Sequence, residues 1–203
     1  MSFSRGMGSG SSNWTIPNAL TMARILFTPL FVAFFLDGSY MAALSMFFLA
    51  GVTDALDGAL ARMLNQCSPL GAVLDPLADK VLLDASFICL ASAGWLPVWL
   101  AVAVVSRDML ILGGVALLTF WGQDMRARIR PSLVSKATTV SQMILVLAAF
   151  LAAYLGSEPF FGDRLVTAVD ALGWLTAGLT LVSGGHYVVK GLAMFGKKAE
   201  LKD

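Results

Sequence analysis

Apolar stretches of nearly constant length divide this chain, and each is close to the ~20 residues that a helix needs to cross a bilayer. Short runs of turn-forming or charged residues separate the stretches. Of the 203 residues, 58% are hydrophobic and 13% are charged, which is more apolar surface than a soluble chain of this size could bury. The sequence therefore predicts an all-α, polytopic membrane protein. We expect six transmembrane helices at about 18–36, 41–63, 69–93, 97–121, 131–155 and 165–189.

The two ends of the chain differ from this apolar part. Residues 1–14 are rich in Ser and Gly, lack the long apolar core of a signal peptide, and indicate a flexible segment with a short interfacial part at Trp14. We expect residues 15–190 to form one membrane domain and residues 191–203 a basic tail that rests on anionic lipid. The net charge of +1 argues against a nucleic-acid partner.

Positive charge is distributed unevenly between the connections. One set of connections, which includes both termini, holds Arg5, Arg62, Arg126, Arg128, Arg130, Lys190, Lys197, Lys198 and Lys202. The other set holds only Arg164. Because cytoplasmic connections carry an excess of Lys and Arg, we expect both termini and the turn at 65–69 on the cytoplasmic side.

Four aspartates interrupt two of the apolar stretches. Asp54 and Asp57 are three positions apart and Asp75 and Asp79 four, so each pair shares one face of a helix. A charge near the bilayer centre costs about 2.5–3.5 kcal/mol on insertion scales, so acids at this depth indicate a functional site. The turn-forming run 65–69 lies midway between the pairs. A chain that reverses there brings the four carboxylates to one depth, where we expect them to face one another.

Carboxylates that face one another repel unless positive charge lies between them. The group contains no Cys or His, and oxygen ligands favour hard divalent cations, so Mg²⁺ or Mn²⁺ is expected before Zn²⁺. Gly58, Ala61 and Gly71 are small and leave room for a ligand or a second backbone. The acids alone also allow another interpretation, a path for protons or ions through a transporter.

Other polar residues lie within the apolar stretches. Asn18 can cap the first helix. Arg24 lies about one and a half turns further on, where it either extends toward the lipid interface or binds the phosphates of a lipid. Arg62, at the cytoplasmic end of its stretch, has a planar fork of donors suited to phosphate. Arg107 and Asp108 are adjacent, point in different directions on a helix, and are expected to need different partners.

Several residues leave both a functional and a structural interpretation open. Arg107 either lines a polar cavity or pairs with another helix, and Lys80 either offsets the acids or touches substrate. Asp84 is expected to be a polar contact between helices, and His186 a structural residue near the interface. A basic entrance is expected around Arg126, Arg128, Arg130, Ser132, Ser135 and Lys136, although ordinary cytoplasmic charge is the favoured explanation for the first two.

The four aspartates belong to the string D-x2-D-G-x2-A-R-x8-G-x3-D-x3-D, which runs from Asp54 to Asp79 without a departure. This string resembles the motif of the CDP-alcohol phosphatidyltransferases, integral membrane enzymes of phospholipid synthesis. The resemblance extends over about residues 15–190. It implies a lipid donor linked to cytidine diphosphate, two divalent metal ions, an alcohol acceptor, CMP as the leaving product, and a homodimer.

The resemblance also implies roles for single residues. Asp79 would be the general base, and Asp54, Asp57 and Asp75 would chiefly be metal ligands, with Asp79 able to share a metal. We expect the donor nucleotide and diphosphate at Asn18, Arg24, Gly58, Ala61, Arg62 and Gly71. We expect the acceptor at Arg107, Arg130, Ser132 and Lys136.

Two acceptors are favoured for a CDP-diacylglycerol donor. Phosphatidylglycerol would give cardiolipin, and glycerol 3-phosphate would give phosphatidylglycerol phosphate. The strings at 15–18, 106–111 and 131–136 resemble the CMP-forming cardiolipin synthases, whereas the phosphatidylglycerophosphate synthases usually carry Arg-Glu at the position of Arg107-Asp108. The first acceptor is therefore favoured, and an inositol phosphate is less favoured. A metal-binding membrane carrier that has kept the fold is the non-enzyme alternative.

Overall fold

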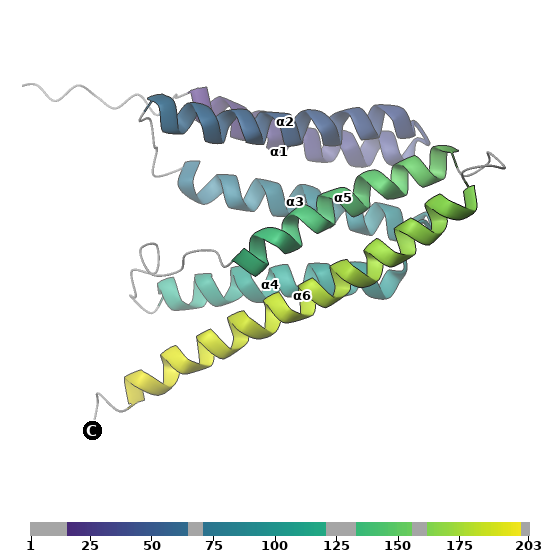
Figure 1. The fold of residues 1–203 in the computed structure, drawn as a ribbon. Coiled ribbons are helices and arrows are strands. Elements are labelled where there is room, and N and C mark those ends of the chain that lie inside the picture. Colours follow the sequence, from purple (N-terminus) through teal and green to yellow (C-terminus); the bar gives the residue numbers. More distant parts are fainter. Residues whose placement is uncertain (1–15, 65–70, 121–132, 156–161, 200–203) are drawn as a thin grey trace, which may run out of the picture.

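The computed structural model describes the backbone of residues 16–64, 71–120, 133–155 and 162–199, and side chains over 22–53, 80–114, 133–155 and 162–189. This part of the chain is helical and contains no strand. Its helices are α1 (Ile16–Leu36), α2 (Tyr40–Leu64), α3 (Gly71–Ser92), α4 (Val98–Phe120), α5 (Leu133–Leu155) and α6 (Gly162–Ala199) (Figure 1). The predicted six-helix, all-α membrane fold is confirmed, and all but one of the helix ends lie within three residues of the prediction.

The exception is the C-terminal end of α6, which continues to Ala199 instead of ending near residue 189. The segment 190–199 has no proline, and its two glycines each cost only about 1 kcal/mol within a helix. Most of the segment expected to be a basic tail is therefore helical.

The helices form a bundle in which α3 occupies a central place. It packs against α1, α4 and α5, while α1 pairs with α2, and α6 packs against both α4 and α5 (Figure 1). Glycines in the left-handed backbone conformation end α1 and α3: Gly38 has a φ of 77° and Gly94 a φ of 74°. Glycine adopts this conformation without strain, so the chain can reverse within a few residues at both places.

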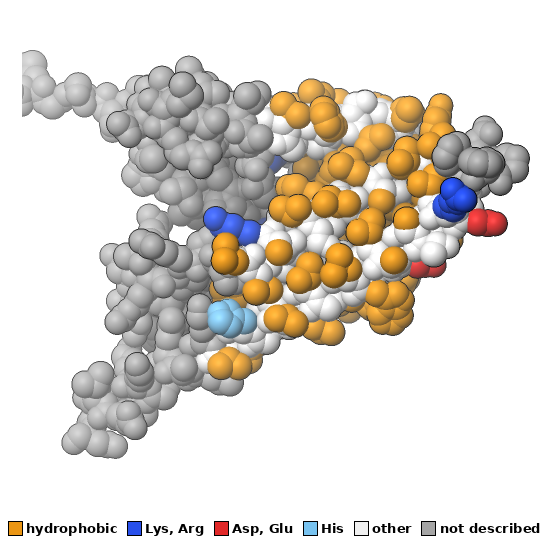
Figure 2. All heavy atoms as spheres, viewed as in Figure 1, with side chains coloured by type: hydrophobic (Ala, Val, Ile, Leu, Met, Phe, Trp, Pro, Cys, Tyr) orange, Lys and Arg blue, Asp and Glu red, His pale blue; other side chains and the backbone are white. Residues whose placement is uncertain are grey.

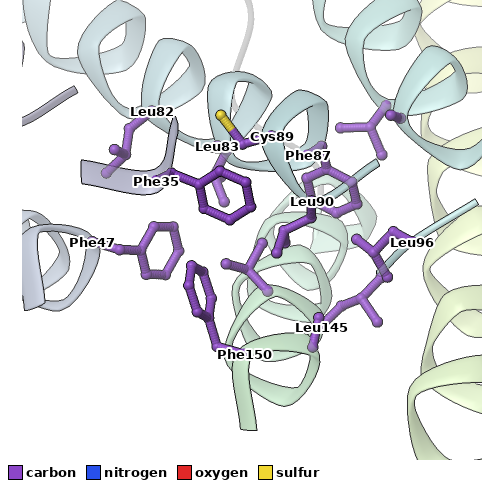
Figure 3. Packing of buried hydrophobic residues seen from close by; sticks show 14 of the residues in the cluster. Phe35, Phe47, Leu82, Leu83, Phe87, Cys89, Leu90, Leu96, Leu145 and Phe150 are labelled. Atoms are coloured by element: carbon purple, nitrogen blue, oxygen red, sulfur yellow. The ribbon is translucent and has the colours of Figure 1, made fainter. Parts of the chain in front are cut away.

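Phenylalanine and leucine side chains pack together in the buried core (Figure 3), and further aromatic rings gather near the two reversals. The ring centroid of Phe35 in α1 lies 5.6 Å from that of Trp95, which precedes α4, and the ring centroids of Trp95 and Phe150 of α5 lie 5.5 Å apart. Tyr40, the first residue of α2, lies 4.8 Å from Trp95. These four residues form the aromatic cluster, which fastens several helices together at one end of the bundle.

Large hydrophobic side chains also cover the outside of the bundle, as Figure 2 shows for one face. Trp174 and Leu181 of α6 are each 70% exposed, and Phe48 of α2 is 60% exposed. Helix α5 and residues Gly162–Val189 of α6 are long and apolar enough to cross a membrane, and shorter apolar parts lie at Met22–Leu36 and Tyr40–Thr53. An apolar exterior of this extent fits a protein solvated by lipid.

Candidate functional site

The acidic motif occupies α2 and α3. Asp54 and Asp57 lie in the C-terminal half of α2, and Asp75 and Asp79 lie in the N-terminal half of α3, so both pairs are helical as predicted. Those halves of the two helices lie at the same end of the bundle (Figure 1). The mutual arrangement of the four carboxylates stays a prediction, because their side chains lie outside those that the structure describes.

Other predicted site residues also lie outside the described side chains. They are Asn18, Gly58, Ala61, Arg62, Gly71, Arg130 and Ser132. Within the side chains that the structure does describe, no group of three or more His, Cys, Asp or Glu could hold a metal ion. That result leaves the predicted metal site untested, since none of the four aspartates belongs to the part searched.

Arg107 is described, and it lies at the junction of three helices. Its side chain is 4% exposed. Its Nη1 donates to Asp108 Oδ1 of the same helix, α4. Its Nη2 donates to Ser135 Oγ of α5 at 2.8 Å and to Ser183 Oγ of α6 at 2.6 Å. The guanidinium is thereby fixed in one orientation by groups from α4, α5 and α6.

Asp108 extends this network to a fourth helix. Its Oδ1, which accepts from Arg107, also lies 2.6 Å from the ammonium nitrogen of Lys80 in α3. We call Lys80, Arg107, Asp108, Ser135 and Ser183 the polar cluster. Because Lys80 directly follows Asp79 in the sequence, the polar cluster begins at the residue next to the acidic motif.

The prediction that Arg107 and Asp108 need different partners is confirmed for their contacts with other helices, because Arg107 binds Ser135 and Ser183 whereas Asp108 binds Lys80. The two residues also bind each other, which was not predicted. Adjacent residues on a helix are separated by about 100°, but the long arginine stem bridges this angle and reaches the neighbouring carboxylate. Lys80 and Arg107 thus bind the same oxygen of Asp108 from two different helices. The interhelical pairing expected as one possibility for Arg107 is confirmed by its bond to Ser183.

Asp84 lies one helical turn after Lys80 and is 8% exposed. It is close enough to Asp108, Lys80 and Arg107 for their charges to act on it. Its Oδ1 has no hydrogen-bond partner among the described residues, so the expected polar contact between helices is not made by that oxygen. With Asp84 included, the buried Arg107 and the partly exposed Lys80 face two buried anions, and such a balance limits the cost of removing these charges from water.

Hydroxyl groups continue the contact between α5 and α6 beyond Arg107. Thr138 Oγ1 donates to the backbone carbonyl of Leu179 at 3.2 Å, and Ser141 Oγ lies 2.6 Å from Thr176 Oγ1. These bonds hold the two helices at the spacing that Arg107 requires. The role of Ser183 was missed by sequence reasoning, although small polar residues recurring at helical spacing in an apolar stretch were a usable signal.

Arg24 of α1 lies apart from the polar cluster, beside residues of α2, α3 and α5. It is 0% exposed and lines an otherwise apolar cavity. A side chain that extended toward the lipid interface would remain accessible, so this burial does not fit that alternative. Lys136, in the first turn of α5, and His186 of α6 are both exposed, and their roles stay predictions.

Sequence comparisons add an independent finding. The model of the CDP-alcohol phosphatidyltransferase family matches residues 14–182. The chain therefore belongs to the CDP-alcohol phosphatidyltransferase family.

Within that family, the chain is similar to two kinds of curated relative. It is 39% identical over 153 residues to a CMP-forming cardiolipin synthase of Rattus norvegicus, covering 68% of this chain and 51% of the relative. It is 37% identical over 188 residues to the enzyme of the same name in Homo sapiens, covering 86% of this chain and 60% of the relative. It is 32% identical over 192 residues to a CDP-diacylglycerol–glycerol-3-phosphate 3-phosphatidyltransferase of Bacillus subtilis, covering 87% and 95%. The chain thus spans about half to three fifths of the two mammalian relatives.

Proposed function

We propose that this protein transfers the phosphatidyl group of CDP-diacylglycerol to the hydroxyl of an alcohol acceptor and releases CMP. The observation that carries this proposal is the complete acidic motif, which has no departure in a chain that belongs to this family. Its two halves lie in helices α2 and α3. Placing carboxylates in membrane helices costs free energy, so they indicate a functional site there.

The proposed reaction is a displacement at phosphorus. The acceptor oxygen forms a bond to the phosphorus that carries the diacylglycerol, and the bond from that phosphorus to the bridging oxygen breaks. The bridging oxygen leaves with its electron pair as part of CMP. The Asp79 carboxylate takes the proton of the acceptor hydroxyl, which is general-base catalysis.

The donor set fits divalent metal ions. Asp54, Asp57, Asp75 and Asp79 offer only carboxylate oxygens, the ligands that Mg²⁺ and Mn²⁺ prefer, and we propose that they hold two such ions. When bound, paired ions supply neutralising charge for a diphosphate and for a leaving oxygen. Arg24 and Arg62 would contribute further positive charge to the donor, while Gly58, Ala61 and Gly71 would leave room for the nucleotide.

Phosphatidylglycerol is the proposed acceptor, so that the product would be cardiolipin. This choice is supported by the 37–39% identity to enzymes named cardiolipin synthase. The phosphate of phosphatidylglycerol would lie near the positive charges of Arg107, Arg130 and Lys136, and Ser132 would donate a further hydrogen bond. We further propose an active site on the cytoplasmic side, as the distribution of Lys and Arg suggests, and a homodimer, as the family resemblance implies.

Glycerol 3-phosphate is the second candidate acceptor. It is favoured by one observation, the match to the Bacillus subtilis glycerol-3-phosphate phosphatidyltransferase along 95% of that enzyme. Both acceptors combine a phosphate with a primary hydroxyl, so the same basic residues would suit either.

Separate assays with the two acceptors test the proposal. The purified full chain would receive CDP-diacylglycerol, a divalent ion, and either phosphatidylglycerol or glycerol 3-phosphate, and both CMP and the new lipid would be measured. We expect CMP and cardiolipin with phosphatidylglycerol, and neither product after chelation of the metal.

Three results would contradict the proposal in different ways. Phosphatidylglycerol phosphate as the product would select the second acceptor. Release of CMP without any acceptor would indicate a hydrolase. Binding of metal and donor without release of CMP under any condition would support the non-enzyme carrier.

A further inference from the structure

Two residues of the proposed reaction come from different helices and are each next to a member of the polar cluster. The base Asp79 lies in α3, and Lys136, which is proposed to bind the acceptor phosphate, lies in the first turn of α5. Lys80 directly follows Asp79, and Ser135 directly precedes Lys136. The acceptor hydroxyl must reach the base while its phosphate is held, so the two helices must keep a fixed separation here.

Asp108 and Arg107 connect the two neighbouring residues through three contacts. The ammonium nitrogen of Lys80 lies 2.6 Å from Asp108 Oδ1. The same oxygen accepts from Arg107 Nη1, and Arg107 Nη2 donates to Ser135 Oγ at 2.8 Å. A continuous route of polar contacts therefore runs from the residue after the base to the residue before the acceptor lysine. We call it the polar route.

The middle of the polar route is buried, whereas its two ends are more accessible. The side chain of Asp108 is 1% exposed and that of Arg107 is 4% exposed, so their bonds are strengthened by the low dielectric of the interior. Ser183 of α6 accepts from Arg107 Nη2 as well and restricts the guanidinium from another side. Lys80 is 21% exposed and Lys136 is exposed. A buried carboxylate that holds accessible ends suits a role in placing other side chains, without contact to substrate.

We propose that Asp108 is a positioning residue for the transfer reaction. Through Lys80 it holds the segment of α3 that carries the base. Through Arg107 and Ser135 it holds the first turn of α5, which carries Lys136. The inference rests on the proposed function and deepens it, because it assigns a role to a carboxylate that is neither the base nor a metal ligand. Interruption of the polar route should misplace the acceptor and leave donor binding intact.

Ser135→Ala interrupts the polar route with a small change. Arg107 keeps its bonds to Asp108 and Ser183, so the bundle should stay folded, while the first turn of α5 loses its bond to α4. The KM for the acceptor should rise about tenfold, because a hydrogen bond to a charged group is worth slightly more than the free energy of a tenfold change. The inhibition constant of CDP-glycerol, a donor head group without acyl chains, should be unchanged. An unchanged acceptor KM would overturn the proposal.

Ser141→Ala is the matched control for this variant. Ser141 also lies in α5, and its hydroxyl lies 2.6 Å from that of Thr176 in α6, but it is not part of the polar route. A general loosening of α5 should therefore affect both alanine variants alike. We expect Ser141→Ala to raise the acceptor KM far less than Ser135→Ala does. Equal rises in the two variants would contradict a specific role for the route.

A double-mutant cycle separates positioning from direct contact with substrate. If Ser135 acts through Lys136, Ser135→Ala should raise the acceptor KM far less in a Lys136→Ala background than in the parent protein. Two independent contacts with substrate would instead give rises that multiply, and that result would overturn the inference. The cycle would be measured with whichever of phosphatidylglycerol and glycerol 3-phosphate yields a lipid product.

Amide hydrogen exchange tests the polar route without turnover. Asp108 makes its contacts with Arg107 and Lys80, in α4 and α3, so an effect of Asp108→Asn on α5 must pass through the route. In the full chain in bilayers, Asp108→Asn should speed exchange within 134–140 and leave 145–150 of the same helix unchanged. Unchanged exchange within 134–140, or a uniform increase along α5, would overturn the inference. A protein that shows the local increase but never releases CMP with either acceptor would contradict the proposed function alone.

Discussion

Asp79 is the single residue whose chemistry is easiest to isolate. The Asp79→Asn variant keeps the size of the side chain but cannot accept the acceptor proton, so transfer should fall by about 10²–10⁴-fold. Metal and donor binding should largely persist, because Asp54, Asp57 and Asp75 remain. CMP release and equilibrium binding of CDP-glycerol would be compared with Asp170→Asn, an exposed change on α6. Turnover of Asp79→Asn near the parent rate would remove Asp79 as the base.

Ser183 offers a test of the polar cluster at one hydroxyl. Its Oγ accepts from Arg107 Nη2 at 2.6 Å, and hydrogen bonds to charged groups contribute about 1.5–3 kcal/mol. Ser183→Ala should lower the free energy of unfolding by an amount near the lower end of that range, because Ser135 still accepts from the same nitrogen. It should also raise the KM for the acceptor more than it lowers kcat.

Ser106→Ala is the matched control for that change. Ser106 is exposed and donates only to Ala103 of its own helix, so its loss should alter stability by less than about 0.5 kcal/mol. Equal destabilisation by the two alanine variants would show that the bond to Arg107 contributes nothing specific.

At the scale of residues, the spacing in the sequence predicts which helix face a side chain occupies but not which side chains it contacts. The spacing of the aspartates was sufficient to assign them to helix faces, since that geometry depends only on the helical repeat. The contact between Arg107 and Asp108 depends instead on the flexibility of a long side chain, which spacing does not encode. The contribution of Ser183 depends on how α6 is placed against α4, which is a property of the packed bundle.

At the scale of elements, the ion pair between Lys80 and Asp108 fastens α3 to α4. Asp108→Asn leaves Lys80 and Arg107 without their shared anion and should cost about 3–5 kcal/mol of unfolding free energy. Lys80→Met should cost less, because Asp108 keeps Arg107 and Lys80 is partly exposed. The double variant should cost less than the sum of the single changes, since the two residues share one interaction.

Thermal unfolding of these three variants in the same detergent would measure the relative size of their stability losses. A larger loss for Lys80→Met than for Asp108→Asn would contradict the central place of the carboxylate. Additive losses would show that the two side chains stabilise the bundle independently.

The helices themselves could be predicted almost completely from the sequence. The length of an apolar stretch and the turn-forming residues beside it assign ten or more residues to one helix at once. An error of two or three positions at each end therefore leaves most of each helix correctly predicted. The end of α6 was the exception, because positive charge was interpreted as the start of a tail, although nothing in 190–199 breaks a helix.

At the scale of the whole molecule, the distribution of Lys and Arg predicts the orientation in the membrane. In a background that lacks Cys67 and Cys89, a cysteine at exposed Ser39, between α1 and α2, should react with an impermeant maleimide only from outside the cell. A cysteine at exposed Lys136, near the start of α5, should react only in inverted vesicles. The opposite pattern would reverse the assigned orientation and place the motif on the outer side.

The aromatic cluster lies at the end of the bundle where α1 meets α2 and α3 meets α4, away from the motif-bearing ends of α2 and α3. Tilting of α2 relative to α5 would pivot at these rings, so displacement would grow with distance and be largest beside the aspartates. Substrates with two fatty-acid tails could then pass between the helices while the rings stay in contact. A change within the aromatic cluster could then alter thermostability while leaving the motif itself untouched.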